Sequence, residues 1–332
     1  MTTGLLALSL GDPAGIGPEI ATKAWRALRA TGPAFMVIGD ARTLRLACDD
    51  PGAVRVVAGP DEAAGAFARA LPVLDIPLAE PAVPGQPSPA NAAAVIGWIE
   101  TGVDLALRGA VAGLVTAPIA KASLYAAGFR FPGHTEFLAD LTAAAPFEGA
   151  RGPVMMLTAG DLRTTLVTIH EPLARVPGLL TVERIVQAGL VTAQALARDF
   201  GIAAPRLAVA GLNPHAGESG SLGREEIDVV APAVQALRAL GVDATGPWPA
   251  DSLFHAEARA GYDAVLCLYH DQALIPVKML DFWGGVNVTL GLPIVRTSPD
   301  HGTGFDIAGR GVARPDSLIA ALRLAAAIAG RR

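Results

Sequence analysis

The sequence predicts an α/β fold with a largely parallel sheet, and three observations support this. Short apolar runs rich in Val, Ile and Leu recur along the chain, amphipathic helical patterns separate them, and 332 residues correspond to about two domains. Apolar runs without polar alternation are typical of strands buried on both faces. A regular alternation of such strands with helices along the chain indicates a parallel sheet covered by helices.

Seven runs are expected to be strands, and most of them end in Gly, Pro, Asp or His. In chain order they are residues 5–10, 35–38, 110–116, 154–158, 164–169, 207–212 and 264–269. The first leads directly into the sequence GDPAGIGPE. Three of the last four are followed, at once or within three residues, by a histidine.

Helices are expected where apolar residues recur at helical spacing between clear start and stop signals. Residues 18–29 begin with a proline, residues 182–200 end before Gly201, and residues 225–240 end before Gly241. The segment 80–91 contains four prolines and is expected to be an exposed connection.

Composition excludes several classes of protein. Hydrophobic residues make up 52% and charged residues only 17%, which excludes intrinsic disorder. The net charge is −5 without a basic block, which argues against a nucleic-acid partner. No apolar window is long enough to span a membrane, and no basic region of a signal peptide precedes the first apolar run. Two cysteines, Cys48 and Cys267, are too few to stabilise a fold of this size through disulfides. We expect a cytoplasmic protein.

Three histidines share one position in the predicted topology. His170, His215 and His270 each follow the end of a buried strand. Ligands in open α/β sheets bind outside the carboxyl ends of the strands, and three neutral imidazoles there can hold one divalent metal. Their spacing matches no local zinc motif, and a lone histidine is more often a hydrogen-bonded structural residue. The metal hypothesis therefore depends on all three sharing this position.

Further polar residues surround these positions. His134 lies in PGHTEF, Asp251 in PADSLF, and Asp271 directly follows His270. A carboxylate here can orient a ligating imidazole or accept a proton from metal-bound oxygen. The alternative for either aspartate is a turn or a helix cap.

Two glycine-rich loops differ in what they predict. GDPAGIGPE has Ile20 where a dinucleotide fingerprint needs its third glycine, and it lacks the Gly-Lys-Ser/Thr ending of a P-loop. The second loop, HGTGFDIAGRG at 301–311, has four glycines that allow close backbone approach to a ligand, and Asp306 could receive its hydroxyl groups. A simple glycine-rich turn is the alternative.

Basic side chains suited to anions follow the last predicted strand. Lys278, Asn287 and Arg296 come soon after His270, and Lys121 follows the strand at 110–116. A compact ammonium and a forked guanidinium suit phosphate and carboxylate groups of a small substrate. The chain has three lysines against 23 arginines, so a lysine can mark a place where arginine would not serve.

Nine motifs in order carry a resemblance to a known family. They are GDPAGIGPE, TAPIAK, PGHTEFL, TIHEPL, GLNPHAGE, PADSLF, YHDQ, VNVTLGLP and RTSPDHGT, and they extend from about residue 5 to residue 320. Together they resemble the PdxA family of 4-hydroxythreonine-4-phosphate dehydrogenases. The chain departs from the expected pattern at Gly304, where HGTA would be usual, and in the variable segment KMLDFWGG.

The resemblance implies an isocitrate/isopropylmalate dehydrogenase-like fold, with two α/β domains and an active-site cleft between them. Residues 1–125 and 295–332 would form the first domain. Residues 126–294 would form the second, which carries the metal ligands and the interface of a homodimer. Such enzymes bind NAD without a Rossmann fingerprint.

The resemblance also implies roles for individual residues. His170, His215 and His270 would bind one divalent metal (zinc, magnesium or cobalt), and His270 would come from the partner subunit. The loop residues Gly302, Thr303, Gly304 and Asp306 would bind NAD near its adenine end. The residues implied to bind substrate are His134, Thr135, Lys278, Asn287 and Arg296. The group that accepts the hydroxyl proton stays open among Asp251, Asp271 and Lys121.

The implied reaction belongs to vitamin B6 biosynthesis. NAD⁺ takes hydride from 4-phosphooxy-L-threonine, and the resulting 2-amino-3-oxo-4-phosphooxybutanoate loses CO₂ to give 3-amino-2-oxopropyl phosphate. Neither the native metal nor the preference for NAD over NADP follows from the residues.

Other functions stay open. Relatives on the same scaffold oxidise threonate or erythronate 4-phosphates or aromatic dihydrodiol acids, and they share the three histidines. PGHTEFLADL and TIHEPL favour the B6 enzyme. A hydrolase or aldolase that uses the histidine triad without NAD is a rival of another class, and the glycine-rich loop at 301–311 speaks against it. Nothing in the sequence favours a non-catalytic binding protein.

Overall fold

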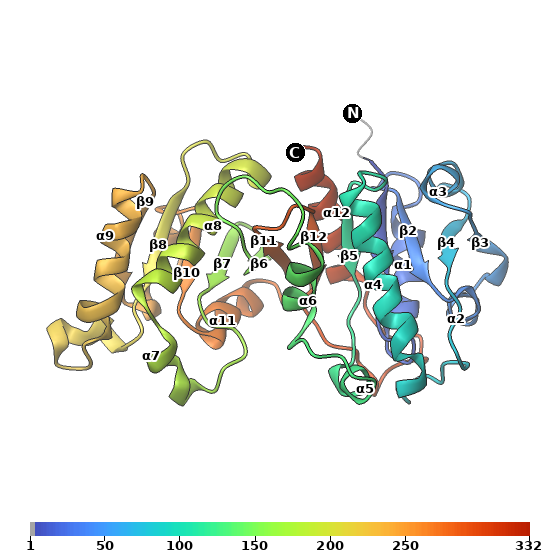
Figure 1. The fold of residues 1–332 in the computed structure, drawn as a ribbon, viewed down its shortest axis with the longest axis horizontal. Coiled ribbons are helices and arrows are strands. Elements are labelled where there is room, and N and C mark those ends of the chain that lie inside the picture. Colours follow the sequence, from blue (N-terminus) through green and yellow to red (C-terminus); the bar gives the residue numbers. More distant parts are fainter. Residues whose placement is uncertain (1–3) are drawn as a thin grey trace. The chain divides into compact units, whose positions relative to one another are not determined.

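The structure is a computed structural model and describes residues 4–332. The chain divides into two compact units (Figure 1). Unit 1 comprises residues 1–146 and 293–330, and unit 2 comprises residues 147–292 and 331–332. This division differs from the predicted one because residues 126–146 belong to unit 1. There the rings of Phe129 and Phe137 pack edge to face at 5.0 Å, beside Phe131 and Tyr125.

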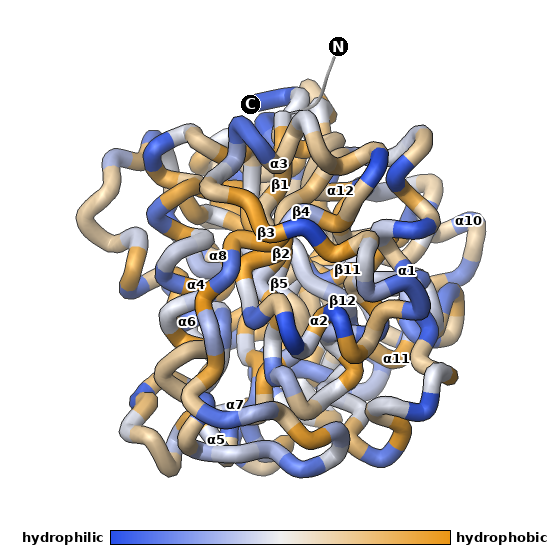
Figure 2. Tube along the Cα trace, turned by 90° about the vertical axis from the view of Figure 1, so that its right-hand side faces the viewer, coloured by the Kyte–Doolittle hydropathy of each residue, from blue (hydrophilic) through white to orange (hydrophobic). Residues whose placement is uncertain are grey.

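Among the described residues, unit 1 contains six parallel strands, most of which bury apolar side chains. In the order β3-β4-β2-β1-β5-β12 they are Val54–Val56, Leu71–Asp75, Phe35–Gly39, Leu6–Ser9, Gly113–Thr116 and Arg296–Pro299. In Figure 2, hydrophobic segments gather around the labels of β2, β3 and β5. Burial of both sheet faces explains why the predicted runs at 5–10, 35–38 and 110–116 lack polar alternation.

Helices cover both sides of this sheet. The longest are α1 (Gly17–Leu28), α4 (Ala92–Leu107) and α12 (Asp316–Ala329), with α4 in front of the strands and α12 behind them in Figure 1. The shorter helices of this unit are α2 (Ala41–Ala47), α3 (Pro60–Ala66), α5 (Lys121–Ala126) and α6 (His134–Leu141). The predicted helix at 18–29 is therefore confirmed as α1, with Pro18 at its start.

Unit 2 is built on six further strands. In the order β11-β6-β7-β10-β8-β9 they are Val286–Leu290, Val154–Ala159, Leu162–Leu166, Ala264–Cys267, Arg206–Ala210 and Asp243–Trp248. The strand predicted at 154–158 is antiparallel to both neighbours, whereas β7, β10, β8 and β9 are parallel. The reason is a tight turn at Gly160 and Asp161, a dipeptide typical of hairpins, with Gly160 in the left-handed region (φ 58°).

The helices of unit 2 pack on this sheet. They are α7 (Val176–Leu179), α8 (Val182–Phe200), α9 (Ala231–Ala239), α10 (Ala256–Arg259) and α11 (His270–Leu280). The predicted helix at 182–200 is confirmed as α8: the Thr181 hydroxyl caps its start, and Gly201 ends it in the left-handed region. The helix predicted from 225 instead begins with a wide turn, Glu226–Val230, before α9.

One core cluster of unit 2 lies between α11 and the sheet. Ala273, Leu274 and Val277 of α11 contribute to it beside strand residues such as Leu157 and Val265. This packing fixes α11, whose first residue is His270. In the part of the chain that the structure describes, no helix is both long enough and apolar enough to cross a membrane.

Candidate functional site

Two of the three strand-end histidines lie side by side in unit 2. β10 pairs in parallel with β7, so that Cys267 stands opposite Leu166 at the carboxyl ends of the strands. His170 follows β7 and His270 follows β10, and their ring centroids are 5.7 Å apart. Both rings line a cavity of about 280 Å³, together with neighbours that include Glu171 and Tyr269.

The third histidine, His215, follows β8, which pairs with the other side of β10. It opens a left-handed turn in which four non-glycine residues have positive φ, namely His215, Ala216, Glu218 and Ser219. Left-handed helical backbone costs roughly 1–2 kcal/mol per non-glycine residue. A turn of this kind persists only where its surroundings hold it, and such strain is concentrated at functional sites.

Buried polar side chains hold the segment before His215. Glu226, which is 3% exposed, accepts hydrogen bonds from the backbone of Leu212 and of Asn213, both at 2.7 Å. The buried amide of Gln272 accepts from the Leu268 backbone and donates to the Gly211 carbonyl, each at 2.7 Å. Gln272 therefore ties the end of β10 to the end of β8. The sequence analysis missed both residues, although a glutamine two positions after a candidate ligand is a usable signal.

A carboxylate orients each of two candidate ligands. His270 Nδ1 lies 2.7 Å from Asp271 Oδ1, and His215 Nδ1 lies 3.1 Å from Glu218 Oε2. A metal-bound histidine typically gives its other nitrogen to such a partner, which leaves Nε2 to face the metal. Within residues 4–332 of one chain, no three His, Cys, Asp or Glu side chains are close enough together to hold a metal. The structure thus brings His170 and His270 together but does not group His215 with them.

Unit 1 contains a separate cluster of basic side chains. Arg296 of β12 is 3% exposed, and its Nη2 donates to Thr116 Oγ1 of β5 at 2.7 Å. His134 begins α6, and its buried Nε2 has no hydrogen-bond partner among the described residues. A Cβ at Gly133 would lie 3.7 Å from the Nζ of Lys121, which begins α5.

Electrostatics in this cluster keep His134 neutral. Burial lowers the pKa of His134 well below 6.5, and the positive charges of Arg296 and Lys121 lower it further. Burial also lowers the pKa of Arg296 to about 10, partly offset by Glu136, so the guanidinium stays charged at neutral pH. A charged fork beside a neutral imidazole forms a donor-rich cluster suited to a phosphate or carboxylate.

The remaining residues predicted to bind substrate are placed as follows. Thr135 is buried in α6 beside His134. Lys278 is in α11, with its Nζ 5.3 Å from the ring centroid of Phe282. Asn287 is in β11, and its buried Oδ1 has no hydrogen-bond partner among residues 4–332. Asp251, the last candidate proton acceptor, is exposed in a short 3-10 turn at Ala250–Ser252.

The glycines of GDPAGIGPE serve close packing. Gly11 has φ 75°, and a Cβ there would lie 2.4 Å from the Pro118 carbonyl oxygen. A Cβ at Gly17 would lie 2.3 Å from the Leu10 carbonyl oxygen, and one at Gly15 would lie 2.7 Å from that of Thr303. A side chain cannot be accommodated at any of these contacts. Close packing therefore explains the glycines, and no Rossmann fingerprint is needed to account for them.

The loop at 301–311 rests on this first loop. The Ile16 backbone N–H donates to the Thr303 carbonyl at 2.9 Å. Gly304 adopts φ 55°, and a Cβ there would lie 3.1 Å from Ile16 Cγ2. Gly304, which stands in place of the alanine of HGTA, is thus at a position with left-handed backbone, where glycine fits best. Gly302 and Asp306 are exposed on the loop.

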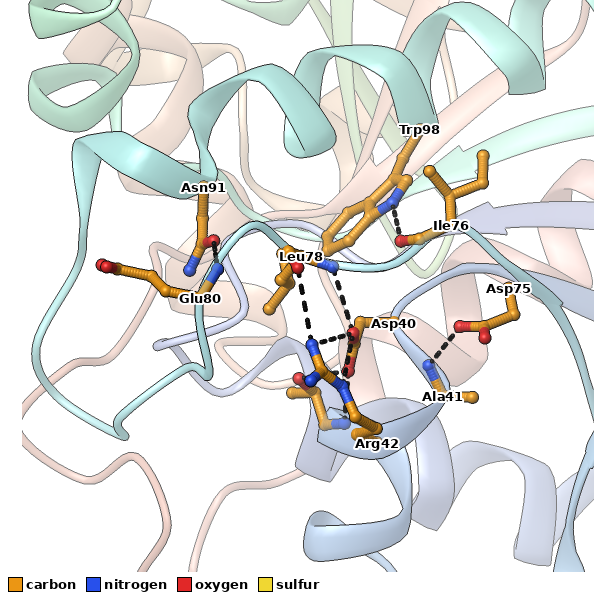
Figure 3. A network of polar contacts seen from close by, with 10 residues as sticks. Asp40, Ala41, Arg42, Asp75, Ile76, Leu78, Glu80, Asn91 and Trp98 are labelled. Atoms are coloured by element: carbon orange, nitrogen blue, oxygen red, sulfur yellow. Dashed lines mark hydrogen bonds and ion pairs between the residues drawn. The ribbon is translucent and has the colours of Figure 1, made fainter.

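A polar network fixes the neighbouring segment 76–91 (Figure 3). Buried Asp40, at the end of β2, caps α2 through the Thr43 backbone at 2.7 Å and accepts from the Leu78 backbone at 3.1 Å. Trp98 Nε1 donates to the Ile76 carbonyl at 3.0 Å. The same segment reaches the first loop, because the Gly85 backbone donates to the Ala14 carbonyl at 2.7 Å.

Comparison with known proteins agrees with the motifs. The family model of the pyridoxal phosphate biosynthetic protein PdxA matches residues 32–325. The 4-hydroxythreonine-4-phosphate dehydrogenase of Caulobacter vibrioides is 73% identical over 332 residues, which are 100% of this chain and 99% of that protein.

Solved structures give the same result. The 4-hydroxythreonine-4-phosphate dehydrogenase of Klebsiella pneumoniae is 42% identical with a TM-score of 0.87, over 98% of both chains. A terephthalate 1,2-cis-dihydrodiol dehydrogenase of Burkholderia xenovorans is 32% identical with a TM-score of 0.64, also over 98% of both. The predicted isocitrate/isopropylmalate dehydrogenase-like α/β fold class is confirmed, and the chain belongs to the PdxA family.

Proposed function

We propose that this chain is an NAD-dependent oxidoreductase that converts 4-phosphooxy-L-threonine to 2-amino-3-oxo-4-phosphooxybutanoate, which then loses CO₂ to give 3-amino-2-oxopropyl phosphate. The observation that carries the proposal concerns buried polar atoms. His134 Nε2 and Asn287 Oδ1, in residues that the family resemblance assigns to the substrate, are buried without a hydrogen-bond partner among the described residues. Such atoms are rare in folded proteins and call for an explanation, which a bound polar substrate supplies.

The basic cluster of unit 1 suits the phosphate of this substrate. Arg296 offers a rigid fork and is itself positioned by Thr116. Neutral His134 offers a donor without the cost of burying a further charge next to that guanidinium. The family resemblance adds Thr135, Lys278 and Asn287 to the residues that bind substrate.

The strand-end histidines fit a divalent metal. His215 and His270 each have Nδ1 on a carboxylate, which fixes the ring and leaves Nε2 for a ligand. A divalent metal here would stabilise negative charge on the reacting oxygen of the substrate. Zinc, magnesium and cobalt are the candidates.

The pairing of His170 with His270 bears on which ligand comes from a second copy of the chain. The resemblance assigns His270 to the partner subunit. His170 and His270 of one chain lie 5.7 Å apart. Within residues 4–332 of one chain, none of the three histidines belongs to a group of three side chains that could hold a metal. Because His170 and His270 already lie together, we propose His215 as the alternative to His270 for the ligand that the partner supplies.

A homodimer is supported by apolar side chains on and after α11. Ile275 is 62% exposed and Met279 is 81% exposed, and the following Phe282 and Trp283 are also exposed. Large exposed apolar patches mark interaction surfaces. We propose that this surface contacts a second copy of the chain, on the same helix that begins with His270.

The loop at 301–311 is proposed to hold NAD. Its glycines leave the backbone open to a ligand. Gly302 and Asp306, which are exposed, and Thr303 and Gly304, which are partly exposed, would contact the adenosine part of the cofactor. Bound NAD⁺ supplies the hydride acceptor. The chain's own part is to orient the cofactor and the substrate.

Of the three candidate proton acceptors, Lys121 is the one beside the basic cluster. Asp271 is already engaged with His270, and Asp251 is exposed on a separate turn. Lys121 is therefore our candidate to take the hydroxyl proton.

NADH formation with a panel of substrates tests this proposal. The panel contains 4-phosphooxy-L-threonine, D-threonate 4-phosphate, D-erythronate 4-phosphate and terephthalate cis-dihydrodiol, each with and without chelator. We expect turnover of the amino acid only, lost with chelator and restored by added metal. Preference for a sugar-acid phosphate or the dihydrodiol would overturn the substrate assignment. Conversion of substrate without NADH formation would favour the hydrolase or aldolase alternative.

A further inference from the structure

The far end of the glycine-rich loop is joined to α1 by a lysine and a glutamate. Lys23 Nζ donates to Glu19 Oε1 at 2.6 Å, to the Gly311 carbonyl at 2.8 Å and to the Ala313 carbonyl at 2.7 Å. Glu19 Oε1 also accepts from the Ala313 backbone at 2.8 Å. We call these contacts the Lys23 latch. They join residues that are almost 300 positions apart in the sequence.

Within the loop, the Ile307 backbone donates to the Gly304 carbonyl at 3.1 Å, and the Arg310 backbone donates to the Ile307 carbonyl at 3.2 Å. Gly304, Gly309 and Gly311 all have positive φ, at 55°, 73° and 72°, and glycine is the most flexible residue. The bond from Ile16 to the Thr303 carbonyl fixes the start of the loop, and the Lys23 latch fixes its end. Beside the latch lies a cavity of about 380 Å³, which Lys23, Gly309 and Gly311 line. The loop would have room to move there if the latch were cut.

The latch needs a lysine. Three acceptor oxygens converge on one nitrogen, and an ammonium carries three protons on a single atom. The guanidinium of arginine spreads its protons over a flat fork and cannot direct three from one nitrogen. This requirement explains why one of only three lysines stands here in a chain with 23 arginines.

We propose that Lys23 and Glu19 are positioning residues that hold the loop at 301–313 in the conformation that binds the dinucleotide. The inference rests on the proposed function, because it assigns the loop to NAD. Neither side chain is assigned a contact with cofactor or substrate. Both act through the backbone of Gly311 and Ala313.

The test compares Lys23→Met and Lys23→Arg with Arg26→Met. Arg26 is the matched control, since it lies on α1, lines the same cavity and pairs with exposed Asp49 rather than with the loop. NADH affinity is measured by fluorescence titration, and amide exchange of residues 304–312 is measured without cofactor. Steady-state kinetics separate KM for NAD from kcat.

Loss of a charge-assisted bond typically costs enough free energy to weaken binding about tenfold. We expect Lys23→Met to raise Kd for NADH and KM for NAD by about that factor, with kcat unchanged and faster amide exchange in the loop. Lys23→Arg should fall between Lys23→Met and the unaltered protein, and Arg26→Met should match the unaltered protein.

Two results would overturn this inference and leave the proposed function intact. They are an unchanged NADH affinity in Lys23→Met, and an unchanged amide exchange of the loop. A fall in kcat at unchanged KM would also contradict it, because that result would make Lys23 part of the chemical step. Failure of the unaltered protein to bind NADH would instead overturn the proposed function.

Discussion

The two groups of candidate residues differ in how the chain holds them. In unit 1, Arg296 and the Nε2 of His134 are buried, and strand neighbours or helix starts fix the side chains. In unit 2, His215 and His270 keep one face toward solvent, and a single carboxylate orients each ring. Burial makes the charge state of unit 1 residues depend on the fold. The histidines of unit 2 instead keep a nitrogen accessible to an added ligand.

This difference suggests a division of roles. A cluster of buried donors that packing holds in place is preorganised for an anion. Accessible imidazoles at strand ends suit a metal that must also meet substrate. Changes at His215 and His270 should therefore abolish activity, whereas changes at Arg296 and His134 should weaken substrate binding.

The largest effect is expected from the histidines. His215→Ala should lower kcat/KM by at least about a thousandfold, because the proposed metal that would stabilise charge in the transition state would be lost. Metal content by elemental analysis should fall with activity. Normal activity after complete loss of metal would remove the Lewis-acid role.

Mixed dimers sharpen this expectation. If His215 crosses the interface while His170 and His270 act within one chain, mixing inactive His170→Ala and His215→Ala proteins restores one intact site per mixed dimer. Mixing His170→Ala with His270→Ala then restores nothing. The reverse pattern would show that His270 crosses instead, as the resemblance implies.

A smaller effect is expected in unit 1. Arg296→Ala should raise KM for the phosphorylated substrate by roughly a hundredfold, since a charge-assisted fork is lost from a buried site. The Kd for NADH should not change. Thermal unfolding shows whether the variant folds, and Arg296→Lys keeps a positive charge without the fork. An unchanged KM would remove Arg296 from the anion site.

The smallest effect is a pH dependence of stability from His134. Because its pKa in the folded protein lies below its ordinary value of 6.5, the unfolded chain binds a proton that the folded chain does not. His134 therefore lowers the free energy of unfolding as the pH falls through 6.5, and has no such effect above it. Urea unfolding should show that the free energy of unfolding falls less between pH 7.5 and pH 5.5 in His134→Gln than in the unaltered protein. Equal losses in both proteins would contradict the depressed pKa.

Much of this architecture was predictable because buried parallel strands leave a clear apolar pattern. The runs before His170 and His270 indicated strands, and both became neighbours in one sheet. The strands β3, β4, β9, β11 and β12 lie outside the seven predicted runs. In β3 and β9, exposed positions and the Gly246-Pro247 pair dilute the apolar pattern. The strand at 154–158 was predicted, but its antiparallel direction was not, because an apolar run carries no information about the direction of its partner.

The candidate site residues came from the motifs and the family resemblance, whereas their contacts left no signal in the sequence. Motif resemblance supplied the candidate ligands, whereas the left-handed turn at His215 leaves no signal in a run of ordinary residues. The Lys23 latch was beyond prediction for a different reason. Lys23 and its backbone acceptors are distant in sequence, and only the packing of the two loops brings them together.

The scarcity of lysine has a consequence for chemical labelling. Lys23 closes the latch, Lys121 lies beside His134, and Lys278 follows His270 by two helical turns. An amine-directed acylating reagent therefore finds few side-chain targets, and each lies at or next to a proposed functional element. Protection of each amine by NADH, substrate or metal, followed by peptide mass mapping, would report on the three elements separately within one unaltered protein.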